Sequence, residues 1–179
     1  MSGIAVWRVV ALGAPAWVRP CPGCLDSTAP FLATDRFRVN ANGSRLDVWL
    51  LYACPRCGAT EKRRLHHRTP VGAIHPERLD GYHRNDAALA WSHAFELAVR
   101  DELPHRVERP PLPAAGTLVA TIEQPHVCGV RWDRLLAREH GWSRARATSA
   151  WRRGELAIDG VRSLADRVAD GRVVRVVLR

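Results

Sequence analysis

Four of the five cysteines occur as two closely spaced pairs, and this spacing is the strongest chemical signal in the sequence. The pairs are Cys21-Pro22-Gly23-Cys24 and Cys54-Pro55-Arg56-Cys57, with 29 residues between them. A C-x-x-C turn lets two thiolates converge on one metal ion at about 2.3 Å, and a second such turn completes a tetrahedral four-sulfur site. The sequence therefore predicts a structural zinc site, and its four ligands are Cys21, Cys24, Cys54 and Cys57.

A thioredoxin-like dithiol is the alternative interpretation of the first pair, because a Pro-Gly dipeptide separates its cysteines. A redox dithiol needs only one such motif, placed between a strand and a helix, and neither the flanking residues nor the second pair fit that arrangement. Gly58 directly follows the second pair, where the chain must turn sharply and glycine reaches positive φ without steric cost. The fifth cysteine, Cys128, lies among apolar neighbours and is expected to be a small buried hydrophobic residue outside the metal site.

The residues between and after the two pairs have the pattern of an antiparallel sheet. Polar and apolar residues alternate over 36–41 and over 46–52, and Asn42-Gly43 between these runs favours a tight type I′ hairpin turn. Residues 60–68 can return as a third strand, so this stretch has the plan of a zinc ribbon. The basic side chains of the third strand could contact phosphate, or could belong to a solvated edge strand whose charge blocks aggregation.

Helical patterns follow the third strand. One helix is expected around 75–83, and a longer one is expected from an Asn85 cap through residues 86–103. Apolar residues recur in the longer helix at three- and four-residue steps and predict one buried face, formed by Ala88, Trp91, Phe95 and Val99. His93 lies off this stripe and is expected to be a surface or internally satisfied side chain rather than a metal ligand.

The prolines set the expected domain organisation. Residues 104–116 contain four prolines, which cannot continue a helix and supply few backbone donors, so this segment is expected to be a linker. The sequence predicts a zinc-ribbon domain with a helical extension over 1–103, the Pro-rich linker over 104–116, and a small basic domain over 117–179 that opens with a strand. Helices and antiparallel strands in both domains give an α+β fold class.

Positive charge is concentrated in the last third of the sequence. The 27 basic and 18 acidic residues give a net charge of +9, and residues 126–179 carry +6 of it, from 12 basic and 6 acidic side chains. Such an asymmetry favours a polyanionic partner such as nucleic acid, although a merely solvated surface would carry the same charges. Charged residues interrupt every apolar run before the roughly 20 residues that a membrane span needs, so a membrane protein is not expected.

One helix start in the basic segment has the features of an anion site. Ser143 is placed to cap a helix by accepting a backbone N–H, and the first N–H groups of that helix together with Arg144 and Arg146 would face one region. Arg131 and Arg134, at the start of the preceding helix, could extend this patch. The planar guanidinium group suits phosphate, which makes these arginines candidate nucleic-acid contacts.

The same segment resembles the small RNA-binding domain named after ribosomal small-subunit protein four. The resemblance rests on the runs 131–142, 143–147 and 153–161, which match an R-L-D-x-x-L helix, an S-R-x-x-A helix and an x-G-x-V-x-V-N-G-x strand. Trp132, Glu155 and Asp159 depart from the family pattern. The resemblance implies RNA binding by seven residues, which are Arg131, Arg134, Ser143, Arg144, Arg146, Arg152 and Arg153.

The N-terminal part is similar to a widespread bacterial family of unknown function over most of residues 7–103. This similarity is carried by residues 37–42 and 46–50, by the second cysteine pair, and by Asn85-Asp86 ahead of Trp91. It implies a bacterial intracellular protein with a ribbon-like start and implies no particular activity.

The features together predict a non-catalytic, zinc-containing protein of the bacterial cytoplasm that binds structured RNA, either ribosomal or transfer RNA. The sequence contains no nucleophile elbow, phosphate-binding loop, dinucleotide fingerprint or H-E-x-x-H motif, and a closed four-cysteine site leaves no open metal position for catalysis. Two alternatives are a protein-interaction adaptor that docks a partner on Trp49 of the ribbon, and a DNA-binding regulator.

Overall fold

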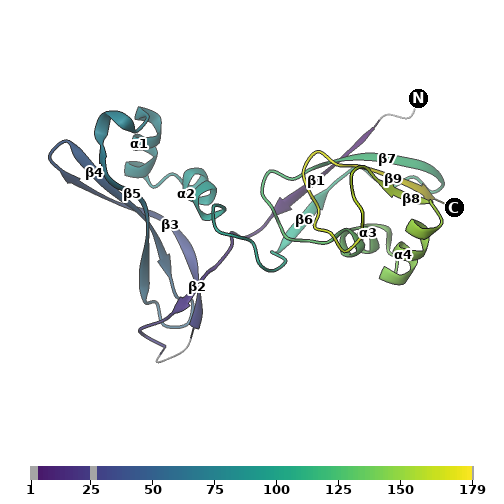
Figure 1. The fold of residues 1–179 in the computed structure, drawn as a ribbon, viewed down its shortest axis with the longest axis horizontal. Helices are drawn as coiled ribbons and strands as arrows, with labels where there is room; N and C mark the ends of the chain where they lie inside the picture. The colour runs from purple at the N-terminus through teal and green to yellow at the C-terminus, as the bar shows by residue number, and fades with distance from the viewer. Residues whose placement is uncertain (1–3, 25–27, 179) are drawn as a thin grey trace. The chain divides into compact units, whose positions relative to one another are not determined.

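The computed structural model describes residues 4–24 and 28–178, and the chain forms two compact units (Figure 1). One unit contains both ends of the sequence, Met1–Gly13 and Val99–Arg179, and we call it the terminal unit. The other, Ala14–Ala98, contains the four paired cysteines, and we call it the cysteine unit. Each unit combines helices with a sheet whose strands are mostly antiparallel, so the predicted α+β fold class is confirmed.

The terminal unit is a five-stranded sheet covered by two helices. The strands run in the order β6-β1-β7-β9-β8, and among the strands that the structure describes here only β1 and β7 pair in parallel. The elements are β1 (Ala5–Ala11), β6 (His105–Glu108), β7 (Gly116–Glu123), α3 (Trp132–His140), α4 (Arg144–Arg152), β8 (Leu156–Ile158) and β9 (Val173–Leu178). No helix in the described part of the chain is long and apolar enough to cross a membrane.

The division into units differs from the predicted domains. Strand β1 lies between β6 and β7, and its side chains Trp7 and Val9 are fully buried in the core of the terminal unit. Strand β6 occupies part of the segment that was predicted to be a linker. The cysteine unit is therefore inserted between β1 and β6, an arrangement that cannot be seen in the sequence because the paired strands lie about a hundred residues apart.

The cysteine unit is a four-stranded antiparallel sheet with two helices on one face. Its strands run in the order β2-β3-β4-β5, and the third predicted strand is confirmed as β5. Its elements are β2 (Trp17–Pro20), β3 (Thr28–Asn42), β4 (Arg45–Ala53), β5 (Thr60–Pro70), a 3-10 turn (Val71–Ala73), α1 (Pro76–Arg84) and α2 (Ala87–Ala94). Every second residue of β4 is buried against the helices, and these residues are Leu46, Val48, Leu50 and Tyr52.

The hairpin between β3 and β4 forms, but its turn is one residue further along than predicted. Asn42 pairs with Arg45, which leaves Gly43 and Ser44 as the two turn residues. Gly43 has a φ of 60°, whereas Ser44 is not among the residues with positive φ. A type I′ turn needs positive φ at both central positions, so the predicted turn type is wrong.

The boundaries of α2 also differ from the prediction. Asp86, not Asn85, caps the helix, because its side chain accepts a hydrogen bond from the backbone N–H of Leu89. Asn85 instead ends α1 in the left-handed region, with a φ of 56°, and its Oδ1 accepts from the N–H of Phe37 at 2.7 Å. The helix ends at Ala94 rather than at residue 103.

The buried face of α2 is not the predicted aromatic stripe. The buried residues are Ala90, His93 and Ala94, small or hydrogen-bonded side chains that allow the helix to approach β3 closely. His93 is satisfied internally, since its Nε2 lies 3.0 Å from the hydroxyl of Tyr82 and its Nδ1 lies 2.7 Å from Glu96. Burial lowers the pKa of His93, although Glu96 opposes this shift.

Candidate functional site

The four paired cysteines lie together where strands β2 and β4 end. Cys21 follows β2 and Cys54 follows β4. These strands lie on either side of β3 and run in the same direction, so they deliver the first ligand of each pair to the same end of the sheet. The four sulfur atoms all lie within 4.8 Å of one another. Sulfurs of different pairs also meet, with 3.5 Å between Cys21 and Cys57 and 3.7 Å between Cys24 and Cys54. The four thiols therefore form one cluster rather than two separate dithiols.

The turn that carries the second pair is held by backbone hydrogen bonds. The N–H of Gly58 donates to the carbonyl of Cys54 at 2.9 Å, and the N–H of Cys54 donates to the carbonyl of Ala59 at 2.8 Å. Gly58 has a φ of 76°, as its place after the last cysteine predicted. Burial opposes ionisation of the Cys54 thiol, but the backbone N–H groups of Cys57 and Arg56 point at it and lower its pKa to about 6. This turn thus stabilises the thiolate form that binds metal.

The cluster fits a single tetrahedral metal ion. Four sulfurs placed 2.3 Å from a common centre are about 3.8 Å apart, close to the sulfur separations across the two pairs. Gly23 allows this close approach, because a Cβ added at that position would lie 2.7 Å from Cys57 Sγ. Cys21 and Cys54 are buried, while Cys57 is exposed. The predicted ligand set therefore comes together as a site that could hold one metal ion.

Cys128 is in the other unit and takes no part in this cluster. It is fully buried in the core of the terminal unit, where burial raises its pKa, and its thiol donates to the carbonyl of His126 at 3.3 Å. The prediction that Cys128 is a small buried hydrophobic residue is confirmed.

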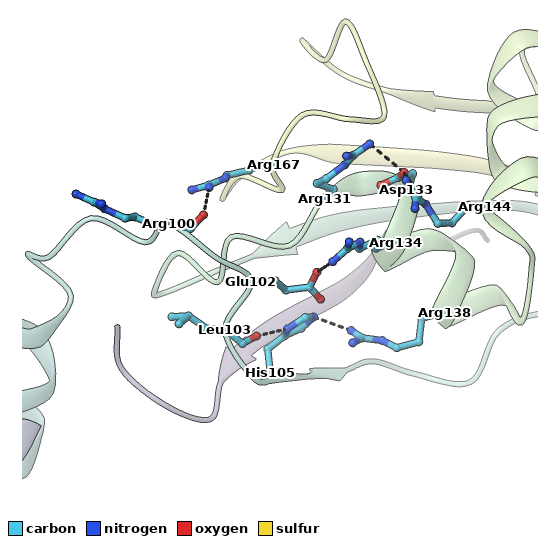
Figure 2. Close-up of polar contacts among 10 residues, drawn as sticks. All are labelled: Arg100, Glu102, Leu103, His105, Arg131, Asp133, Arg134, Arg138, Arg144 and Arg167. Carbon is cyan, nitrogen blue, oxygen red and sulfur yellow. Dashed lines mark hydrogen bonds and ion pairs between the residues drawn. The ribbon is translucent and has the colours of Figure 1, made fainter. Parts of the chain in front are cut away.

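The N-terminal ends of α3 and α4 bring three of the predicted arginines together in the terminal unit (Figure 2). Arg131 and Arg144 both donate to Oδ2 of Asp133, at 3.1 Å and 2.6 Å. Arg134 donates to Glu102 at 2.8 Å. Asp133 is nearly buried, whereas the three guanidinium side chains are between 39% and 55% exposed. Acidic side chains therefore orient these arginines without removing them from solvent.

Further arginines that the sequence analysis missed lie beside these three. Arg138 contacts His105 Nε2 at 2.8 Å and is 45% exposed, while Arg167 donates to the carbonyls of Val99 and Arg100 (Figure 2). The spacing of Arg131, Arg134 and Arg138 at i, i+3 and i+7 places them on one helix face and is the signal that would have added Arg138. We define the arginine row as Arg100, Arg131, Arg134, Arg138, Arg144 and Arg167.

The remaining predicted contacts do not belong to this row. Ser143 caps α4 as predicted by accepting from the N–H of Arg146 at 3.1 Å. However, residues two positions apart on a helix point in nearly opposite directions, so Arg146 does not face the same region as Arg144. Arg146 lies over the ring of Trp142 instead and, with Arg153, lines a separate cavity of about 430 Å³. The predicted patch is therefore divided between the arginine row and this separate cavity.

Arg152 and Arg153 end the same helix. Arg152 is exposed, and Arg153 is held by Glu155 at 2.7 Å and by Ser149 Oγ. Glu155 is one of the positions where the sequence departs from the RNA-binding pattern, and its carboxylate offsets the charge of Arg153. The cavity between α4 and β9 is therefore less basic than the arginine row.

The fold and the cysteine cluster together define an α+β protein of two units, one of which carries a four-cysteine metal-ligand cluster. The chain belongs to the family described as "Protein of unknown function (DUF1062)", whose sequence model matches residues 39–161. The match extends beyond the N-terminal region in which a family resemblance was expected, and it includes both α3 and α4. No curated protein and no solved structure matches the chain.

Proposed function

We propose that this chain is a non-catalytic, zinc-stabilised protein that binds structured RNA through the arginine row of its terminal unit. The observation that carries the proposal is the gathering of six exposed or half-exposed arginines, four of which form ion pairs with just three carboxylates among the described residues, those of Asp133, Glu102 and Glu139. Each guanidinium has five N–H donors, and the acidic partners use only some of them. The row therefore keeps free N–H donors for phosphate oxygens.

The resemblance to the RNA-binding domain of ribosomal small-subunit protein four supports RNA as the polyanion. The residues that the resemblance implies and the arginine row have Arg131, Arg134 and Arg144 in common. These side chains come from the starts of two successive helices, where backbone N–H groups also favour anions. Arg146, Arg152 and Arg153 would then contact RNA at the edge of this interface or would not contact it.

Zinc is the metal that the cysteine cluster suits best. Four thiolates in a tetrahedral arrangement select zinc or an iron–sulfur cluster, and the sulfur separations leave room for one ion rather than a cluster. Zinc would cross-link the ends of β2 and β4 and stabilise the cysteine unit. Four protein ligands leave no position for a metal-bound water, so the proposed role of the metal is structural.

The RNA proposal is tested by measuring the affinity of the full chain for transfer RNA and for a ribosomal RNA hairpin over a range of salt concentrations. Each phosphate contact that is lost should lower the log–log salt slope by about 0.9. The variant with Arg134→Ala and Arg138→Ala should therefore bind more weakly, with a slope lower by somewhat under two units. The matched control is Arg8→Ala with Arg106→Ala, which removes two exposed, ion-paired arginines from β1 and β6.

The control variant should bind like the original protein. Equal losses in both double variants would show that only overall charge matters, and this result would contradict a defined interface. Equal affinity for duplex DNA and structured RNA would favour the DNA-binding alternative. No affinity for any nucleic acid would favour the adaptor alternative, in which the chain binds another protein in the bacterial cytoplasm.

A further inference from the structure

The sheet of the cysteine unit has a second face, opposite α1 and α2, that combines an aromatic ring with basic side chains. On β4 the side chains of Val48, Leu50 and Tyr52 are fully buried, so the alternate residues Trp49 and Leu51 point to the opposite face. Trp49 is half-buried, and Leu32 on β3 is 46% exposed on the same side. This face is therefore partly apolar and accessible within the cysteine unit.

The register of the three strands places two arginines on either side of the tryptophan. Arg38 of β3 pairs with Trp49 of β4, and Trp49 pairs with Arg64 of β5. Neighbouring strands lie about 4.8 Å apart, so one line of side chains across the sheet reads Arg-Trp-Arg over roughly 10 Å. Lys62 pairs with Leu51 in the next line along the strands.

Unlike Arg131, Arg134, Arg138 and Arg144 of the arginine row, the basic side chains of this face have no ion-paired carboxylate among the described residues. Arg38, Lys62 and Arg64 are exposed, and no carboxylate of residues 4–24 or 28–178 forms an ion pair with them. Asp47 is the acidic residue of β4 on this side, and the N–H of Arg68, the side chain of His67 and the charge of Arg64 lower the pKa of its carboxyl. Its carboxylate already accepts from His67 at 2.9 Å and from the N–H of Arg68 at 3.1 Å.

We propose that this face binds single-stranded nucleic acid, with an unpaired base stacked on Trp49 and the flanking phosphates held by Arg38 and Arg64. An aromatic side chain between cations matches a ligand that has planar bases along a chain of phosphates. Single strands fit better than a duplex, because only unpaired bases offer their ring faces to a flat sheet. The proposal goes beyond the RNA interface of the terminal unit and does not depend on it.

The test is the binding of the full chain to a fluorescently labelled oligomer of twelve uridines, followed by anisotropy at several salt concentrations. Trp49→Ala should weaken binding roughly 5- to 150-fold, the range expected when one stacked base is lost, whereas Trp49→Phe should keep most of the affinity. Arg38→Ala with Arg64→Ala should lower the salt slope by about 1.4 units, because each phosphate contact with a single strand contributes about 0.7.

Arg78→Ala with Arg84→Ala is the matched control, since it removes two exposed arginines from α1 on the other face of the sheet. Metal content of every variant should equal that of the original protein, and every variant should remain folded at the assay temperature in a thermal unfolding experiment, with a small loss of stability in the control from the exposed pairs of Arg84 with Asp80 and Asp86. If Trp49→Ala and the Arg38/Arg64 variant bind the oligomer no more weakly than the control, the proposal is wrong.

A second outcome would also overturn it. If a glutamate dodecapeptide displaces the labelled oligomer as well as unlabelled uridine dodecamer does, the face binds acidic peptide rather than nucleic acid. The Arg134/Arg138 variant separates this proposal from the RNA interface of the terminal unit, because it should bind the uridine oligomer as the control variant does.

Discussion

Asp133 is the side chain on which the geometry of the arginine row depends most. It is nearly buried, and its Oδ2 accepts hydrogen bonds from Arg131 and Arg144 at the same time. Weakening the pairing of a buried charge is costly. Removing Arg144 would take away two of the three guanidinium hydrogen bonds to Oδ2 and leave only that of Arg131, so it would change stability as well as surface charge. Arg134 and Arg138 are better probes of RNA binding, because their removal leaves both ion pairs of Asp133 in place.

Gly23 sets the tightest steric limit in the cysteine cluster. Gly23→Ala would place a methyl group 2.7 Å from Cys57 Sγ, so a sulfur must move from its tetrahedral position. Overpacking of this kind costs about 1–3 kcal/mol, and the apparent zinc affinity should fall roughly 5- to 150-fold. Competition with a chromophoric chelator measures this change. Gly72→Ala is the control, since a Cβ there meets nothing within 4 Å, and equal affinities in the two variants would contradict the packing argument.

His140 predicts a pH dependence for the terminal unit. Its ring stacks on Trp142, and burial, assisted by the charge of Arg109, lowers its pKa to about 4. The unfolded chain has a histidine pKa near 6.5, so between these values the unfolded state binds a proton that the folded state does not. Stability should therefore fall as the pH decreases from about 6.5 to about 4.

The measurement is the free energy of unfolding of the terminal unit against pH for the original protein and for His140→Phe, which keeps an aromatic ring in place. The variant should lose less stability over this pH range than the original protein. Parallel curves for the two proteins would show that His140 titrates normally in the folded state.

Among the secondary-structure elements, the junction between α1 and α2 is fixed by two adjacent residues, one of which ends α1 while the other begins α2. Asn85 ends α1 in the left-handed region, and Asp86 caps α2. Asp86→Ala should lower the free energy of unfolding of the cysteine unit by about 1 kcal/mol, since one helix N–H loses its acceptor. Asp80→Ala, in which an exposed i,i+4 pair with Arg84 is lost, should cost only a few tenths of a kcal/mol. Chemical denaturation compares them, and equal costs would argue against the cap.

Elements whose signals are local could be predicted from the sequence, and those that depend on tertiary packing could not. The cysteine pairs, the β3–β4 hairpin and the Ser143 cap each depend on a few neighbouring residues, and each is present. The buried face of α2 was predicted wrongly, because large apolar residues suggested the stripe while the close approach to β3 favours the small residues Ala90 and Ala94. Where a short helix lies directly on a sheet, close packing determines which of its residues are buried, and the hydrophobic pattern of the sequence does not.

At the scale of the whole molecule, the two units should respond separately to loss of the metal. Apparent binding free energies of structural zinc sites are about 10–16 kcal/mol, which exceeds the stability of most small domains. Cys54→Ser should therefore abolish metal binding and unfold the cysteine unit. Both tyrosines of the chain, Tyr52 and Tyr82, are buried in that unit and report its unfolding by NMR, while hydrogen exchange of β9 reports on the terminal unit.

Strand β9 should keep its protection from exchange in Cys54→Ser, because its partners β7 and β8 belong to the terminal unit. Cys128→Ala is the control and should keep one metal ion per chain. Loss of protection throughout β9 in Cys54→Ser, or loss of metal in Cys128→Ala, would show that the units or the ligand set are assigned wrongly.

The organisation of the whole chain was the feature least accessible to sequence analysis. The N-terminal strand completes a sheet with residues more than 90 positions away, and its parallel pairing with β7 has no local signature. Likewise, Arg144 and Arg146 are close in the sequence and were therefore predicted to form one anion site, although their side chains point to different sides of α4. The pairs of Arg134 with Glu102 and of Arg144 with Asp133 join residues 32 and 11 positions apart, and such pairs leave no spacing pattern in the sequence.

RNA binding by the arginine row is tested most directly by ultraviolet cross-linking of the full chain to RNA in cells, followed by sequencing of the recovered RNA and identification of the cross-linked peptides. We expect recovery of one or a few structured RNAs, cross-linked in the segments that carry the arginine row, and a marked loss of this recovery in the Arg134/Arg138 variant but not in the Arg8/Arg106 control. RNA recovery that is equal in the two variants, or no higher than from a protein of similar charge, would contradict it.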